Sequence, residues 1–186
     1  MKKASLYLLC LCLLTGCSGQ PKELDQAAQL RSRILQASEI TFAAEVRADY
    51  GDQTHSFSMD CRSDSKGTLH FQVTEPDSIS GISGQISGEG GQLVFSDAAL
   101  AFPLLADEQL TPISAPWILM QTLSSGYITS ACTEEGQIHL TANETYEEDA
   151  LQLDIWLNTQ LLPVQADILY DGVRILSVSV KDFAIA

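Results

Sequence analysis

Residues 151–158 read Leu151-Gln152-Leu153-Asp154-Ile155-Trp156-Leu157-Asn158, with an aliphatic side chain at every odd-numbered position. Because successive side chains of a β-strand point to opposite sides, this segment predicts a strand with one apolar face. An apolar face opposite one that carries Gln152, Asp154 and Asn158 is typical of an antiparallel sheet with one side in water. Such a sheet must bury its apolar face against other parts of the protein.

The same period of two recurs before and after this segment. Turn signals such as Ser65-Lys66-Gly67 and Asp171-Gly172 favour hairpins, so consecutive strands are expected to run antiparallel. Alternation places Arg47 on the polar face of the first strand. Further strands are predicted at 40–50, 57–61, 69–73, 128–133, 137–145, 164–170 and 173–183, with shorter ones at 81–88 and 92–96.

Two segments show the helical period instead. Residues 22–37 carry apolar side chains at three-four spacing behind Pro21, and residues 115–123 form a second predicted helix. Helices of this kind can cover the apolar side of a sheet. The predicted fold class is α+β: a curved antiparallel half-barrel of about 8–11 strands, its concave face covered by about two or three helices.

Large apolar side chains suggest where a ligand could bind. Trp117 and Met120 lie one helical turn apart and would point into the concave sheet. With Phe71 of the third strand they are the candidate lining of a hydrophobic cavity. The alternative is that they fill the core, as apolar helix stripes usually do. Trp156 falls on the polar face and is a candidate partner-contact residue.

The N-terminus has the organisation of an export signal, with Lys2 and Lys3 before an apolar stretch too short to span a membrane. Leu14-Thr15-Gly16-Cys17 resembles the lipobox of bacterial lipoproteins, which implies cleavage before Cys17 and diacylglycerol on its thiol. We expect a lipoprotein signal peptide at 1–16, a lipidated tether at 17–21 and one domain at 22–186. The alternative is an ordinary secreted protein with a cysteine at its cleavage site.

Charge restricts the partners of the processed chain. The sequence has 10 basic and 24 acidic residues, and loss of Lys2 and Lys3 leaves 8 against 24, a net charge of −16. Phosphates and anionic headgroups repel such a domain, which argues against nucleic-acid binding and against a polybasic membrane patch. The expected location is therefore the extracytoplasmic face of the cell membrane, with the lipid on Cys17 as the anchor.

Of the five cysteines, Cys10 and Cys12 leave with the signal and Cys17 carries lipid. Alternation places Cys61 and Cys132 on apolar strand faces, where they could form a disulfide or remain two buried thiols. The sequence lacks metal-ligand spacings such as CxxC and HxxxH, so no metal or cofactor is expected. Ser63-Asp64-Ser65-Lys66 matches SxxK but falls in a predicted turn, so no enzyme is expected.

A family resemblance rests on three features: the early helix with its long first hairpin, the stretch 74–82, and the closing run 162–172 followed by Val180-Lys181-Asp182-Phe183. In these the chain resembles the LolA/LolB-like lipoprotein-carrier superfamily, and among its members the GerS-type germination lipoproteins of Gram-positive spore formers. The resemblance implies a half-barrel that binds an acyl chain or an envelope protein without chemistry. The alternative function is a regulatory or structural partner of a cell-wall enzyme in sporulation or germination.

One departure from the family concerns cargo transport. The soluble carrier of this superfamily has no lipid anchor, whereas this chain has Cys17. The expected function is therefore a membrane-anchored binding module for a lipid-like ligand or an envelope protein.

Replacing Cys17 with serine should abolish lipid attachment, because a thioether to diacylglycerol needs the thiol. Incorporation of labelled palmitate in cells, followed by membrane fractionation, measures this directly. The matched variant Cys132→Ser should keep both the label and the membrane association. Label retained in Cys17→Ser would contradict the assignment.

Overall fold

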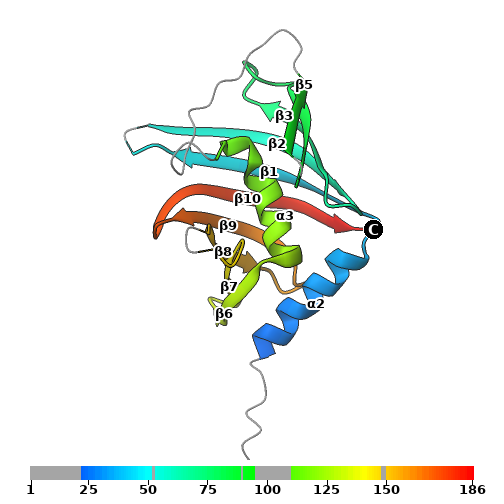
Figure 1. The fold of residues 1–186 in the computed structure, drawn as a ribbon, viewed down its shortest axis with the longest axis vertical. Helices are drawn as coiled ribbons and strands as arrows, with labels where there is room; N and C mark the ends of the chain where they lie inside the picture. Colours follow the sequence, from blue (N-terminus) through cyan, green and yellow to red (C-terminus); the bar gives the residue numbers. More distant parts are fainter. Residues whose placement is uncertain (1–21, 52, 89, 95–109, 148–149) are drawn as a thin grey trace, which may run out of the picture.

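The computed structural model describes residues 22–51, 53–88, 90–94, 110–147 and 150–186 (Figure 1). The predicted signal peptide, Cys17 and the tether lie outside these residues. Over the ranges described, no helix is both long enough and apolar enough to cross a membrane.

One open, curved antiparallel sheet dominates the fold (Figure 1). Ten strands are ordered β5-β4-β3-β2-β1-β10-β9-β8-β7-β6, so the first and last long strands pair at the centre. The predicted α+β class with a large antiparallel sheet is thereby confirmed. The strands are β1 Glu39–Asp49, β2 Thr54–Asp64, β3 Leu69–Glu75, β4 Ser83–Ser87, β5 Gly90–Val94, β6 Tyr127–Glu134, β7 Gln137–Asn143, β8 Gln152–Leu157, β9 Pro163–Tyr170 and β10 Val173–Ile185.

Alternating burial follows the predicted apolar pattern closely. In β8, Leu153, Ile155 and Leu157 are buried while the residues between them are half-buried. In β1 every second residue from Ile40 to Ala48 is buried, and Arg47 lies on the exposed face as expected. The buried side chains form one core cluster with those of the helices.

A bulge near the end of β10 keeps its apolar residues on one face. The register with β1 shifts between Thr41 and Ala43, and Asp182 takes a positive φ of 53°. An extra residue in a strand reverses its alternation. As a result Val180 and Phe183 are both buried, and the Phe183 ring stacks on Phe42 with centroids 5.4 Å apart.

A second bulge changes the predicted position of Cys132. The register between β6 and β7 shifts between Ile128 and Ser130, so the inward position after Ile128 falls on half-buried Ala131. Cys132 is consequently exposed, whereas Cys61 is buried in β2. The order of strands places β1, β10, β9, β8 and β7 between these two cysteines, and both are free thiols. The structure thus contradicts the disulfide expected as one alternative.

The two helices differ in what they contact. Helix α3 (Ala115–Ser125), preceded by the 3-10 turn Pro112–Ser114, contacts β1 and β10 at the middle of the sheet (Figure 1). Helix α2 (Lys22–Gln36) contacts α3 and the edge strand β6. Helix α3 carries no charged residue, and seven of its residues are buried. In α2 the buried residues are Ala27, Leu30 and Ile34. Helix α3 is therefore the more deeply embedded of the two.

The turn from α3 into β6 requires a glycine for steric reasons. A Cβ added to Gly126 would lie 2.7 Å from both Thr122 Cγ2 and Thr122 O, and 2.9 Å from Asn143 O. Two of these atoms belong to the backbone and cannot rotate away. Only a residue without a side chain allows the chain to leave α3 this close to β7.

Substituting Gly126 with alanine should destabilise the fold by about 2 kcal/mol, the usual effect of overpacking a tight site. Gly88 is the matched position, because a Cβ there meets nothing within 4 Å. Gly88→Ala should change stability by no more than about 0.5 kcal/mol. Denaturant unfolding measures both, and a Gly126→Ala variant as stable as the wild type would contradict the steric argument.

Candidate binding site at the ends of the helices

The guanidinium of Arg31 joins the two helices. Its Nε donates to the carbonyl oxygen of Leu123 at 2.9 Å, and Nη2 donates to those of Thr122 at 3.2 Å and Gly126 at 2.7 Å. Thr122 O also accepts from the backbone N–H of Gly126 at 2.9 Å. Carbonyls at the C-terminal end of a helix carry partial negative charge, so a cation there is stabilising. Burial lowers the pKa of Arg31, but arginine stays protonated at physiological pH.

A pocket of about 280 Å³ lies between α2, α3 and the β2–β3 hairpin. Its buried lining includes the apolar side chains of Ile34, Ile40 and Met120, which belong to the core cluster. Leu35, 66% exposed, and Lys66 of the hairpin turn are among its exposed lining. An apolar wall that continues into the core and a polar rim are the features of sites that bind small apolar groups.

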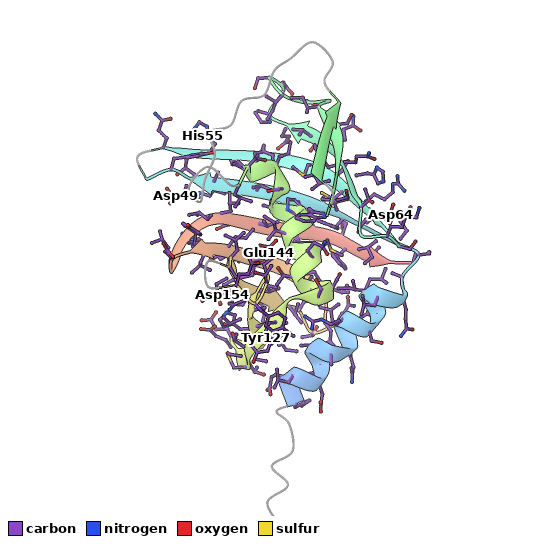
Figure 2. The ribbon with its side chains drawn as sticks, in the orientation of Figure 1. Asp49, His55, Asp64, Tyr127, Glu144 and Asp154 are labelled. Carbon is purple, nitrogen blue, oxygen red and sulfur yellow. The ribbon has the colours of Figure 1, made fainter. Side chains whose placement is uncertain are left out.

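The hairpin side of this pocket is held by its own hydrogen bonds. The Asp64 carboxylate accepts from the backbone N–H of Lys66 at 2.8 Å and of Thr68 at 3.0 Å. Burial raises the pKa of Asp64, but these N–H groups and nearby His70 outweigh that effect, and the net shift is downward. Figure 2 shows Asp64 on the same side of the molecule as the C-terminal end of α2. The turn between β2 and β3 falls at residues 65–67, as predicted, whereas Ser63 and Asp64 are the last residues of β2.

Among the pockets lined by described residues, no single one brings together the three residues expected to line a cavity. Met120 is buried and lines this pocket. Phe71 is buried in β3 and borders a wide depression of about 540 Å³ on the outer face of β1, β2 and β3. Trp117 is half-buried against the core, and its Nε1 is enclosed without a hydrogen-bond partner among the described residues.

We regard the smaller pocket as the better candidate site. Both linings mix apolar side chains with polar ones, such as Asp60 in the outer depression and Asp64 at the helix ends, but the outer depression, although larger, is open. The pocket at the helix ends is more enclosed and has aliphatic side chains in its wall. Burial of apolar ligand surface is the main source of affinity for lipid-like groups.

Sequence reasoning missed the role of Arg31. The residue falls at helical spacing between Leu30 and Ile34, both buried. The sequence does hold one signal for this role, which is an arginine next to the apolar stripe of a helix. Such a guanidinium is partly buried and therefore needs hydrogen-bond acceptors. Its acceptors are more than 90 residues away in sequence, so no local pattern identifies them.

Replacing Arg31 with methionine keeps most of the apolar stem but removes all three hydrogen bonds. We expect a loss of about 2 kcal/mol in unfolding free energy, since bonds from a charged donor are lost and α3 loses the cation at its C-terminal end. Arg33 is the matched control, because it is exposed and makes a single 3.3 Å contact with Gln160 O. Arg33→Met should change stability by about 0.5 kcal/mol or less in the same denaturant titration. Equal losses in both variants would refute the specific role of Arg31.

No protein-family model matches the sequence, and no curated protein matches it. Solved structures similar to this chain include a LolA superfamily protein from Nitrosomonas europaea, at 9% identity and TM-score 0.45, covering 86% of this chain and 93% of that one. The lipoprotein LppX of Mycobacterium tuberculosis has 13% identity and TM-score 0.44, and the match covers 89% of this chain and 96% of LppX. A chain of a MucA/MucB complex of Pseudomonas aeruginosa has 10% identity and TM-score 0.41, and the match covers 89% of this chain and 58% of that one.

Proposed function

We propose that this chain is a membrane-anchored, extracytoplasmic binding module that holds an acyl chain or a comparable lipid-like group without chemistry. The observation that carries the proposal is the pocket between α2, α3 and the β2–β3 hairpin, whose apolar wall continues into the core. The anchor in this proposal is the lipid on Cys17. The signal and lipobox at the N-terminus support that part of it.

The pocket wall suits a flexible hydrocarbon. A chain that enters beside Leu35 would contact Ile34, Ile40 and Met120, and each methylene that it buries contributes about 0.8 kcal/mol. Met120 supports this role because methionine is unbranched and adapts its shape to different occupants. A volume of about 280 Å³ is at the lower end of ligand sites, so the pocket accommodates a segment of a chain and not a whole lipid.

Charge favours an occupant that brings little negative charge with it. Lys66 is the basic residue among those lining the pocket, and Asp64 and Glu39 are the acidic ones. The strongly acidic domain repels anionic headgroups at a distance. A neutral or zwitterionic lipid, or an apolar side chain of an envelope protein, fits these charges better than a phosphate-rich ligand.

Filling the pocket with a bulky side chain should block binding. Gln121 lines the pocket and is half-buried on α3, so Gln121→Trp should weaken binding of a neutral probe, a fluorescent long-chain monoacylglycerol, by about tenfold or more. Gln29 is exposed on α2 away from the pocket, and Gln29→Trp should leave the affinity unchanged. Circular dichroism checks that both variants are folded.

Two results would count against the proposal. If the wild type does not take up the neutral probe, the lipid form fails, and binding of an envelope protein that Gln121→Trp abolishes would identify the competing occupant. If Gln121→Trp and wild type bind the probe equally well, the ligand lies elsewhere.

A further inference from the structure

A cluster of reactive side chains lies on the outer face of β6, β7 and β8, far from the pocket. Its centre is His139, which faces Cys132 across the β6–β7 pair and Trp156 across the β7–β8 pair. Cys132 Sγ lies 4.0 Å from His139 Nδ1, and the imidazole stacks on the Trp156 ring at 4.7 Å and 7°. Figure 2 shows Asp154, which belongs to this cluster, well apart from Asp64 at the pocket.

The local chain geometry creates this arrangement. Glu135 and Gly136 have positive φ values of 49° and 82°, which is the conformation of a two-residue hairpin turn that sets a fixed register. That register places Cys132 opposite His139. The bulge at Thr129 then directs the thiol to the outer face, where it is exposed. Sequence alternation alone would have buried it.

Carboxylates lie beside both nitrogens of the imidazole. Glu134 Oε2 is 3.5 Å from Nδ1, and Asp154 Oδ1 is 3.3 Å from Nε2, although the latter contact lacks hydrogen-bond geometry. Thr141 Oγ1 donates to Asp154 Oδ1 at 2.9 Å and fixes that carboxylate. Beyond Asp154, Asp167 is paired with Arg174. A positive charge that forms on His139 is therefore stabilised from two sides, in a site where the His139 and Asp154 side chains are only 20% and 22% exposed.

The two cysteines of the described domain differ in access. Cys61 is buried, and burial raises the pKa of its thiol, so it stays protonated and unreactive. Cys132 is exposed beside a base. Free exposed thiols are unusual in the oxidising compartment outside the cytoplasm, which is where we propose this chain to act.

We propose that Cys132 and His139 form a thiol–disulfide exchange site, whose co-reactant is a disulfide R–S–S–R′ carried by a small molecule or by a protein. His139 Nδ1 takes the proton of the Cys132 thiol, and the thiolate sulfur attacks one sulfur of the disulfide. A Cys132–S–S–R bond forms as the S–S bond of the co-reactant breaks. The leaving R′–S⁻ takes the proton back from His139. One disulfide and one thiol are consumed and one of each is produced.

Each residue of the cluster has a distinct part in this step. Cys132 is the nucleophile and His139 the base. Glu134 and Asp154 stabilise the imidazolium, and the stack on Trp156 holds the plane of the ring. This arrangement of nucleophile, base and orienting acid follows the general logic of activated nucleophiles.

The test is the rate of mixed-disulfide formation between oxidised glutathione and the full lipid-anchored chain in mild detergent, followed by mass spectrometry over a range of pH. At neutral pH, His139→Asn and His139→Phe should both react at least about tenfold more slowly than wild type, since loss of a general base usually costs about a hundredfold or more. The phenylalanine variant retains a ring that can stack on Trp156, so a purely structural role of His139 would spare it. The deficit should shrink at alkaline pH, where the thiol ionises without help.

Controls separate this proposal from the pocket. Cys132→Ser should abolish the adduct, Cys61→Ser should leave its rate unchanged, and Glu134→Gln should slow it. Equal rates for wild type and both His139 variants at every pH would overturn the proposal, as would an adduct that persists in Cys132→Ser. Binding of the neutral lipid probe should be unaffected in all of these variants, so the failure of one proposal is distinguishable from that of the other.

Discussion

The central constraint on this chain is that a ten-stranded sheet with an apolar inner face must be kept from water. Helix α3 meets this constraint over β1 and β10, at the middle of the sheet. Three hydrogen bonds from Arg31 of α2 fix the C-terminal end of α3. The chain then turns into β6 at Gly126, where a side chain would collide with the backbone of Asn143. The position of α3 then determines the walls of the pocket at the helix ends.

The two faces of the sheet serve different chemistry. The inner face, with α2 and α3, offers an aliphatic wall that extends to the surface near Leu35 and Lys66, which suits an apolar occupant. The outer face carries most of the charged residues of the strands and, on β6 to β8, the group of Cys132, His139 and Trp156. Because the sites lie on opposite faces, a ligand in the pocket and a disulfide at Cys132 would not compete for space.

Local sequence patterns predicted much of the fold because burial alternates along single strands. The segment 151–158 and the Asp171-Gly172 turn, with φ values of 50° and 73°, match the expected strand and hairpin. Bulges at Thr129 and Asp182 could not be predicted, because one extra residue reverses the alternation without a distinct composition. This is why Cys132 was assigned to the wrong face. Helical spacing predicts Met120 as a lining residue. The role of Arg31 and the hairpin wall of the pocket could not be predicted, because they depend on contacts between residues distant in sequence.

The central claim is that an acyl chain binds at the ends of the helices, in contact with Met120. Photocrosslinking with a neutral monoacylglycerol whose acyl chain carries a diazirine near its methyl end, followed by peptide mapping, tests it most directly. We predict that the adducts fall on the segments around Ile34, Met120 and residues 63–67 and are competed by unlabelled monoacylglycerol. Competable adducts on the outer face of the sheet, or no saturable adducts at all, would contradict it.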